Sequence, residues 1–255
     1  MNLSLVIPVY NEAGGVEETA RSLRCVLAYL RQSHQVELIL VDDGSRDRTP
    51  ELLRAAFSDD PQVHVICHQR NQGIGAALRT GFQHATGDVV ITTDFDGTYA
   101  FSIIPQLLAK MQVDHADIVI ASPYHPNGSV QGTMLLGRTA SLLYRALVNR
   151  RVYSWTSMFC AYRREVVEKL ALHENGALAS TELLIKASLR RYRVSEMPVH
   201  LRRRTFGRSR VNTLRLSVMH LLYLARLVPV ALAAHIAHLR PVYRAAPRPV
   251  PAFKD

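Results

Sequence analysis

Strand-like and helix-like segments alternate along the first 122 residues, and this alternation restricts the fold more than any other feature of the chain. Apolar and β-branched runs predict strands at residues 3–10, 36–43, 63–67, 87–94 and 116–122. The segments between them predict helices at residues 15–31, 49–57, 74–84 and 103–111, the second with Thr49 as N-cap and Pro50 as its first residue. Strands that alternate with helices form a parallel sheet covered on both faces, so the predicted fold class is α/β.

The alternation weakens after residue 122. Residues 123–132 predict a loop, and the chain beyond it predicts further elements in the order helix, strand–helix, helix and strand, near residues 138–148, 158–170, 180–192 and 193–201. A proline-rich stretch at residues 241–255 predicts a disordered tail.

Carboxylates follow two of the predicted strands. Asp42 and Asp43 end one strand, while Asp94 and Asp96 end another. Acidic residues often cap turns at such places, but ligands of parallel sheets also bind at the carboxyl ends of the strands. Two aspartates one residue apart suit Mg²⁺ or Mn²⁺ and leave coordination places for a diphosphate. A dinucleotide site at residues 73–78 is the weaker alternative, because Leu78 stands where its third glycine belongs.

The formal net charge of +10 favours an anionic partner, such as a phosphorylated substrate, a membrane surface or nucleic acid. The basic cluster at residues 202–210 contains a single aromatic residue, Phe206, and so lacks the interleaved aromatic residues that stack on bases, which argues against nucleic acid.

The three cysteines, Cys25, Cys67 and Cys160, lie far apart and predict buried free thiols in a reducing compartment. The first ten residues are strand-like and do not resemble a signal peptide.

Four motifs, LSLVIPVYNEAGGV, LILVDDGSRDRT, RNQGIGAALRTGF and GDVVITTDFDGTY, occur in the order and spacing typical of family 2 glycosyltransferases, which this chain resembles. The later stretches TSMFCAYRREVVEKL and RRRTFGRSRVNTLRL resemble those of dolichyl-phosphate mannose synthases and bacterial polyprenyl-phosphate glycosyltransferases. The resemblance covers roughly residues 3–220 and implies a GT-A fold, whose nucleotide-binding sheet is mostly parallel and flanked by helices.

The resemblance also implies roles for individual residues. The base and ribose of a nucleotide-sugar donor would contact Pro8, Tyr10, Glu12, Val41 and Asp43. Asp94, the backbone near Phe95, and Asp96 would hold the ribose, the Mg²⁺ or Mn²⁺ ion and the diphosphate. Together with these two aspartates, phosphate-binding Arg204 and Arg210 would form the catalytic set.

The chain departs from that family pattern at three positions. Pro123 stands where an arginine is usual, so a phosphate contact is lost or supplied by His125 or Arg138. Arg210 replaces a lysine, and Thr98 replaces a glutamine. The donor sugar therefore stays open among mannose, glucose and N-acetylglucosamine, with mannose or glucose favoured.

The expected acceptor is a polyprenyl or dolichyl phosphate. Its phosphate is already an anionic nucleophile, so it needs cationic positioning by arginines rather than a general base. A sugar or lipid hydroxyl acceptor is the alternative, with Glu182 as a candidate base, although the favoured interpretation of Glu182 is that it lines the site or caps the helix after Ser180. A non-catalytic basic membrane- or nucleic-acid-binding module is a third interpretation.

The most apolar segment follows the basic cluster. Arg226 and Pro229 interrupt it, and its arginines fall on one side of a helix, which favours a helix lying on a membrane over one crossing it. An ordinary packing helix is the alternative. The predicted organisation is a GT-A domain at residues 1–212, an interfacial amphipathic helix at 213–240 and the tail at 241–255, with the protein peripheral on the cytoplasmic face of the cell membrane.

Overall fold

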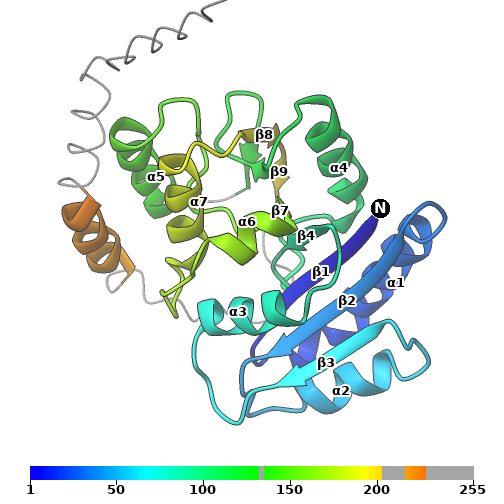
Figure 1. The fold of residues 1–255 in the computed structure, drawn as a ribbon. Coiled ribbons are helices and arrows are strands. Elements are labelled where there is room, and N and C mark those ends of the chain that lie inside the picture. The colour runs from blue at the N-terminus through cyan, green and yellow to red at the C-terminus, as the bar shows by residue number, and fades with distance from the viewer. Residues whose placement is uncertain (132–134, 203–215, 228–255) are drawn as a thin grey trace, which may run out of the picture.

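The computed structural model describes residues 1–131, 135–202 and 216–227. A seven-stranded sheet runs through its centre in the order β3-β2-β1-β4-β7-β5-β8 (Figure 1). The pairs at β7 are antiparallel and the others are parallel. The strands are β1 (Asn2–Val9), β2 (Gln35–Asp42), β3 (Val63–Cys67), β4 (Val89–Thr92), β5 (Ile118–Ser122), β7 (Cys160–Arg163) and β8 (Val194–Pro198).

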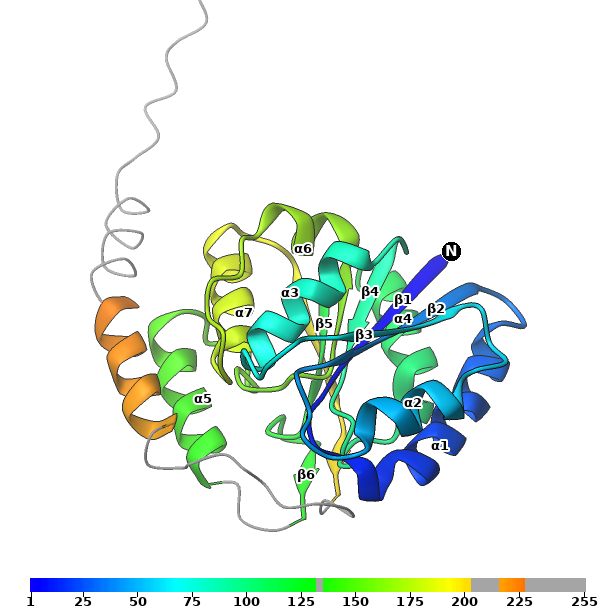
Figure 2. The ribbon, with the colours of Figure 1, turned by 90° about the horizontal axis from the view of Figure 1, so that it is seen from below.

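Helices cover both faces of this sheet (Figure 2). One face carries α1 (Val16–Leu30), α2 (Thr49–Ala56) and α4 (Ile104–Val113). The other carries α3 (Ile74–His84), α6 (Arg164–Lys169) and α7 (Ala179–Leu189), with α5 (Leu135–Leu147) and a helical segment at 216–227 beyond them. Because successive strand residues point to opposite faces, Leu5 and Ile7 join the first core while Val6 joins the second. This explains why the strands read as continuous apolar runs.

Strand register brings the predicted site residues to one edge of the sheet. Pro8 pairs with Val41 across β1 and β2, and Val6 pairs with Thr92 across β1 and β4. The carboxyl ends of these parallel strands therefore open on the same side. The loops that follow β2, β3 and β4 carry Gly44, Gly73 and Gly97, respectively, at positive φ.

The predicted α/β class is confirmed, as is a mostly parallel sheet flanked by helices, and the predicted strands and helices occur close to their expected bounds. Two short 3₁₀ helices, η1 (Ala13–Gly15) and η2 (Phe101–Ile103), were not expected. The predicted loop at 123–132 contains β6 (Ser129–Val130), which pairs with β9 (His200–Leu201). A two-residue strand is too short to produce a periodic signal, so sequence patterns miss it.

Two other expectations were wrong in part. Thr49 is the first residue of α2 rather than its N-cap, and Pro50 is therefore its second residue. The Thr49 hydroxyl instead donates to Asp47 and accepts the amide of Glu12, which ties the helix to the end of β1.

All three cysteines are free, but only Cys160 is buried, while Cys25 and Cys67 are exposed.

Several predictions fall outside the described residues. These include Arg204, Arg210, the boundary at 212, the tail at 241–255 and most of the proposed interfacial helix at 213–240. Within the described ranges, none of the helices combines the length and the apolar character needed to cross a bilayer.

Candidate active site

A cavity of about 1080 Å³ opens beside the carboxyl end of β4. Asp94 and Asp96 lie in its wall, and Thr98, Tyr124 and Ser157 add further polar groups. The remaining wall is largely apolar and comes from α5 and the segment at 216–227, including Leu143, Leu221 and Leu224. The cavity therefore has carboxylates on one part of its wall and leucines on another.

The two aspartates are held by a tight turn after β4. Asp96 Oδ1 accepts the Thr98 amide at 3.1 Å and the Thr98 hydroxyl at 2.7 Å, while Gly97 between them adopts a φ of +73°. The Phe95 side chain points into the core, and its carbonyl accepts the Thr19 hydroxyl at 3.2 Å. Burial of Phe95 thus leaves its neighbours Asp94 and Asp96 partly exposed at the cavity.

The donor set of Asp94 and Asp96 fits a hard divalent cation such as Mg²⁺ or Mn²⁺. Both side chains are carboxylates, and both line the same cavity. Across the described part of the chain, no three His, Cys, Asp or Glu side chains come together in a way that could hold a metal. Two carboxylates would leave coordination places on such a cation for water or for a diphosphate.

Pro8, Tyr10, Glu12, Val41 and Asp43 gather where β1 and β2 end, as expected for one binding surface. Pro8 and Val41 are buried neighbours in the register, and Tyr10 and Glu12 are partly exposed. None of the five lines the cavity that contains Asp94 and Asp96. The structure thus places the predicted nucleotide residues and the paired aspartates at the ends of neighbouring strands.

Asp43 is almost completely buried and binds the loop before α3. Its Oδ1 accepts the Gln72 amide at 2.9 Å and contacts His68 Nδ1 at 2.8 Å, and its Oδ2 accepts the Gly73 amide at 2.7 Å. His68 Nε2 in turn contacts the Thr80 hydroxyl at 2.9 Å. His68 and Gln72 were not among the predicted site residues, although the glycine-bearing motif that contains Gln72 and begins two residues after His68 was an available signal.

Glu182 is also buried, and its carboxylate is fully engaged. It accepts the amides of His173 at 2.9 Å and Glu174 at 2.8 Å, and it pairs with Lys186. Burial raises the pKa of the Glu182 carboxyl, but the hydrogen bonds from Lys186 and from these two amides bring it below its ordinary value. A carboxylate in this setting is a poor general base, which needs a pKa near the working pH.

The wall of the cavity contains two further groups, His220 and Tyr99, that sequence patterns did not reveal. His220 is buried, and its Nδ1 lies 3.0 Å from the Tyr144 hydroxyl. Burial lowers the pKa of His220, so its imidazole is neutral near neutral pH. Tyr99 contacts the Ser157 hydroxyl at 3.2 Å and packs edge-on against Phe159.

Pro123, which the sequence comparison predicts to replace an arginine of the family, lies in the wall of the cavity. Pro123 and Tyr124 line the cavity, and Arg138 lies close enough to Tyr124 to lower the pKa of its hydroxyl, although burial keeps that pKa above its ordinary value. His125 packs edge-on against Tyr153, with ring centroids 5.2 Å apart. Neither Arg138 nor His125, the two residues predicted to supply the phosphate contact in place of the usual arginine, lines the cavity.

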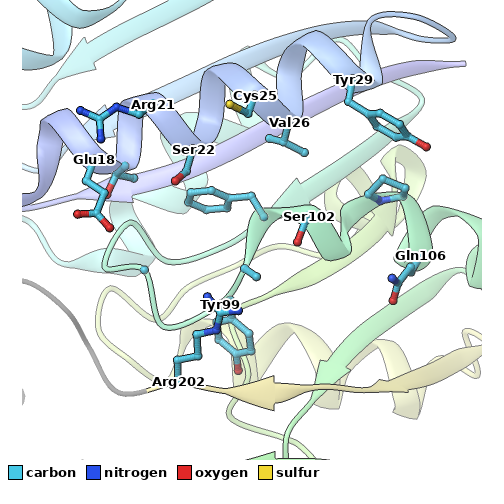
Figure 3. Close-up of a pocket in the computed structure, with 15 residues that line it drawn as sticks. Glu18, Arg21, Ser22, Cys25, Val26, Tyr29, Tyr99, Ser102, Gln106 and Arg202 are labelled. Atoms are coloured by element: carbon cyan, nitrogen blue, oxygen red, sulfur yellow. The ribbon is translucent and has the colours of Figure 1, made fainter.

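A second cavity, of about 800 Å³, lies between α1 and the turn that follows Asp96 (Figure 3). Glu18, Ser22 and Tyr29 line it from α1, and Arg202 lies opposite them near Tyr99. Tyr99 lines both cavities. Arg202 also donates its backbone amide to the Thr98 carbonyl at 3.0 Å, so the start of the basic cluster contacts the turn that bears Asp96.

Curated relatives cover most of this chain. An undecaprenyl-phosphate 4-deoxy-4-formamido-L-arabinose transferase from Salmonella choleraesuis (strain SC-B67) is 33% identical over 216 residues, which are 84% of this chain and 64% of the relative. A protein of the same name from Salmonella paratyphi A (strain ATCC 9150 / SARB42) is 32% identical over the same shares. The chain spans less than two thirds of the length of these relatives.

Solved structures share the fold. Glucosyl-3-phosphoglycerate synthase from Mycobacterium tuberculosis, crystallised with Mn²⁺, uridine diphosphate and glucosyl-3-phosphoglycerate, aligns with a TM-score of 0.63 at 22% identity, covering 92% of this chain and 80% of that one. A further mycobacterial protein aligns with a TM-score of 0.66 at 18% identity, covering 91% and 73%. At these identities the likeness establishes the fold alone.

The family model described as "Glycosyl transferase family 2" matches residues 4–171, a span that includes β1 to β5 and both pairs of strand-end aspartates. This match confirms the resemblance seen in the sequence motifs. The chain belongs to glycosyl transferase family 2.

Proposed function

We propose that this protein is a metal-dependent inverting glycosyltransferase that moves a sugar from a nucleoside-diphosphate donor to a polyprenyl phosphate. The observation that carries the proposal is the cavity that Asp94 and Asp96 line on one part of its wall and leucines from α5 and 216–227 line on another. A site that joins a diphosphate–metal group to a lipid phosphate needs carboxylates at one end and an apolar surface beyond them. The names of the curated relatives, which are undecaprenyl-phosphate sugar transferases, support the same acceptor class.

In the proposed reaction, a phosphate oxygen of the lipid attacks the anomeric carbon of the donor sugar. The bond from that carbon to the diphosphate oxygen breaks, and its electron pair leaves with the nucleoside diphosphate. One displacement inverts the anomeric configuration. The nucleophile is already an anion, so no proton has to be removed.

Asp94 and Asp96 would hold Mg²⁺ or Mn²⁺, which supplies Lewis-acid neutralisation of the leaving diphosphate. The Thr98 hydrogen bonds fix the Asp96 carboxylate, and Gly97 allows the turn that presents it. Pro8, Tyr10, Glu12, Val41 and Asp43 would bind the base and ribose at the ends of β1 and β2. Arg204 and Arg210 would position the phosphates.

The hydrogen bonds and the low pKa of Glu182 argue against a hydroxyl acceptor. A hydroxyl nucleophile needs a base, and Glu182 was the candidate from the sequence. Its carboxylate already accepts two amides and pairs with Lys186, and its pKa is below the ordinary value. The proposed lipid phosphate acceptor avoids this requirement.

The described residues also support a peripheral membrane position. Leu142, Leu143 and Leu147 are exposed on α5, and Leu221 and Leu222 are exposed on the neighbouring segment at 216–227 (Figures 1 and 2). Leu143 and Leu221 also line the cavity, so the exposed apolar surface continues into the site. A prenyl chain could remain in the bilayer while its phosphate enters. On this account the protein lies on the cytoplasmic membrane face, where nucleotide sugars are available, and binds no nucleic acid.

The donor sugar is a separate part of the proposal. The family resemblance favours mannose or glucose, whereas the relatives' names add 4-deoxy-4-formamido-L-arabinose as a candidate. A thermal-shift panel of nucleoside diphosphates with Mn²⁺ identifies the base, because a ligand that binds only the folded state raises its stability. If none of the nucleoside diphosphates stabilises the protein with or without metal, the donor assignment is wrong and the non-catalytic reading gains support.

A further inference from the structure

The loop at residues 172–176 connects α6 to α7 and lies against the amino-terminal end of α3. Glu182 of α7 is 3% exposed and accepts the amides of His173 and Glu174 from this loop. We propose that Glu182 is a positioning residue for the donor pocket. It acts by holding this loop against residues 72–75, the glycine-bearing segment whose amides bind Asp43. The inference rests on the proposed function, because it assumes that Asp43 belongs to that pocket.

The loop contacts the glycine-bearing segment directly. The Gly75 amide donates to the Asn175 carbonyl at 2.7 Å. A Cβ atom at Gly73 would collide with that same carbonyl, and a Cβ atom at Gly75 would collide with the Glu174 carbonyl. Gly73 also has a φ of +99°, which disfavours any side chain. The two segments therefore fit together only because both positions are glycine, and displacement of one segment displaces the other.

The glycine-bearing segment in turn contacts Asp43. Gly73 and Gln72 donate their amides to the two carboxylate oxygens of Asp43, at 2.7 and 2.9 Å. Asp43 directly follows β2, next to Val41 in the predicted nucleotide surface. A continuous series of hydrogen bonds thus leads from Glu182 through the loop at 172–176 and Gly73–Gly75 to Asp43.

Arg79 of α3 holds the same loop from the other side. Its Nη1 donates to the Glu174 carbonyl at 3.2 Å and to the Leu172 carbonyl at 3.4 Å, and its Nη2 donates to the Asn175 side chain. Glu182 thus binds the amides of this loop, while Arg79 binds its carbonyls. The loop is fixed between α7 and α3, and two independent substitutions can release it.

The charge of Glu182 is essential to this arrangement. The carboxylate accepts from two backbone amides and from Lys186, and His173 Nδ1 lies 3.2 Å from its Oε1. A glutamine has one acceptor oxygen, and its NH₂ group would face another donor. Glu182→Gln therefore keeps the size of the side chain but loosens the loop. The donors around Glu182 explain why this position carries a carboxylate, and this explanation does not require Glu182 to transfer a proton.

The test combines hydrogen exchange with kinetics on the full chain. Glu182→Gln and Arg79→Gln should each speed exchange of the Gly75 amide and raise the donor KM by about tenfold, the scale of one lost hydrogen bond to a charged group. Exchange in β1 and β4, kcat and the lipid acceptor KM should stay close to wild type. The matched control is Glu165→Gln, which removes an exposed Glu–Lys pair four residues apart on α6.

Two results would overturn the inference. One is Gly75 exchange in both variants equal to that of Glu165→Gln, which would show that the loop does not depend on Glu182 or Arg79. The other is faster exchange spread evenly over β1 and β4, which would mean that Glu182 supports global stability only. Failure of the proposed function is seen separately, as an inability of the wild-type protein to bind any nucleoside diphosphate while the exchange pattern still holds.

Discussion

Asp43 Oδ2 accepts the Gly73 amide at 2.7 Å, so the carboxylate that follows β2 fixes the loop that leads into α3. The interaction joins two of the four sequence motifs that identify the family. Asp43 therefore has a structural role in addition to its predicted contact with the donor nucleotide.

Asp43→Ala should raise the dissociation constant of the donor nucleotide by about tenfold or more, because it removes a proposed ligand contact and releases the amides of Gln72 and Gly73. Titration calorimetry with the nucleoside diphosphate measures this change, and Asp59→Ala, which removes an exposed carboxylate, is the control. Unchanged nucleotide affinity would remove Asp43 from the donor pocket.

Asp96→Asn should lower metal-dependent transfer by at least about 100-fold while the melting temperature stays near wild type. The asparagine oxygen can still accept the two hydrogen bonds from Thr98, so the turn survives, but the negative charge needed at the cation is lost. Transfer rates across a Mn²⁺ titration measure the effect. Wild-type activity and metal dependence in this variant would refute the metal assignment.

The exposed leucines of α5 should contribute to membrane binding. Changing Leu142, Leu143 and Leu147 together to serine should weaken binding to anionic vesicles by about tenfold, because part of the apolar area that would enter the bilayer is lost. Truncation after Asn212 should weaken it further, with nucleotide binding nearly unchanged in both proteins. Liposome flotation measures both, and Val113→Ser, at the exposed end of α4, is the control. Flotation equal to wild type in both proteins would rule out this membrane surface.

Acid should destabilise the wild-type protein more than Glu182→Gln. The folded-state pKa of Glu182 lies below its ordinary value, so the ionised carboxylate stabilises the folded state. This stabilisation is complete above a pH of about 4.3, the pKa of a glutamate in the unfolded chain. It is lost as the pH falls through the lower pKa that Glu182 has in the folded protein. Urea unfolding of both proteins at about pH 6 and about pH 3 measures how much unfolding free energy each protein loses on acidification. The contributions of the other carboxylates cancel when the loss in Glu182→Gln is subtracted from the loss in the wild-type protein. Equal losses in the two proteins would contradict this role.

The sequence predicted the central sheet well, because strands buried on both faces are continuous apolar runs separated by helical periodicity. It did not predict that β7 inserts antiparallel between β4 and β5, since strand order depends on pairings far apart in the chain. The placement of Asp94 and Asp96 beside a ligand-sized cavity followed from the rule that parallel sheets bind ligands at the carboxyl ends of their strands.

The rest of the site could not be predicted from local patterns. His220 and Leu143 share one cavity wall because α5 packs beside 216–227, a contact between segments distant in sequence. Glu182 was interpreted as a site-lining or capping residue, or as a base, because sequence alone does not show its donors. Only the fold brings the loop at 172–176 to both Glu182 and Gly75.

Transfer of a sugar from a nucleotide sugar to undecaprenyl phosphate by the purified full chain is the decisive assay for the proposed reaction. We expect that a panel of labelled donors with Mn²⁺ yields one labelled lipid product, that chelation of the metal abolishes its formation, and that mild acid releases the sugar because the product is a sugar phosphodiester. An acid-stable product formed on a hydroxyl acceptor, with no transfer to undecaprenyl phosphate from any donor, would refute the proposed reaction.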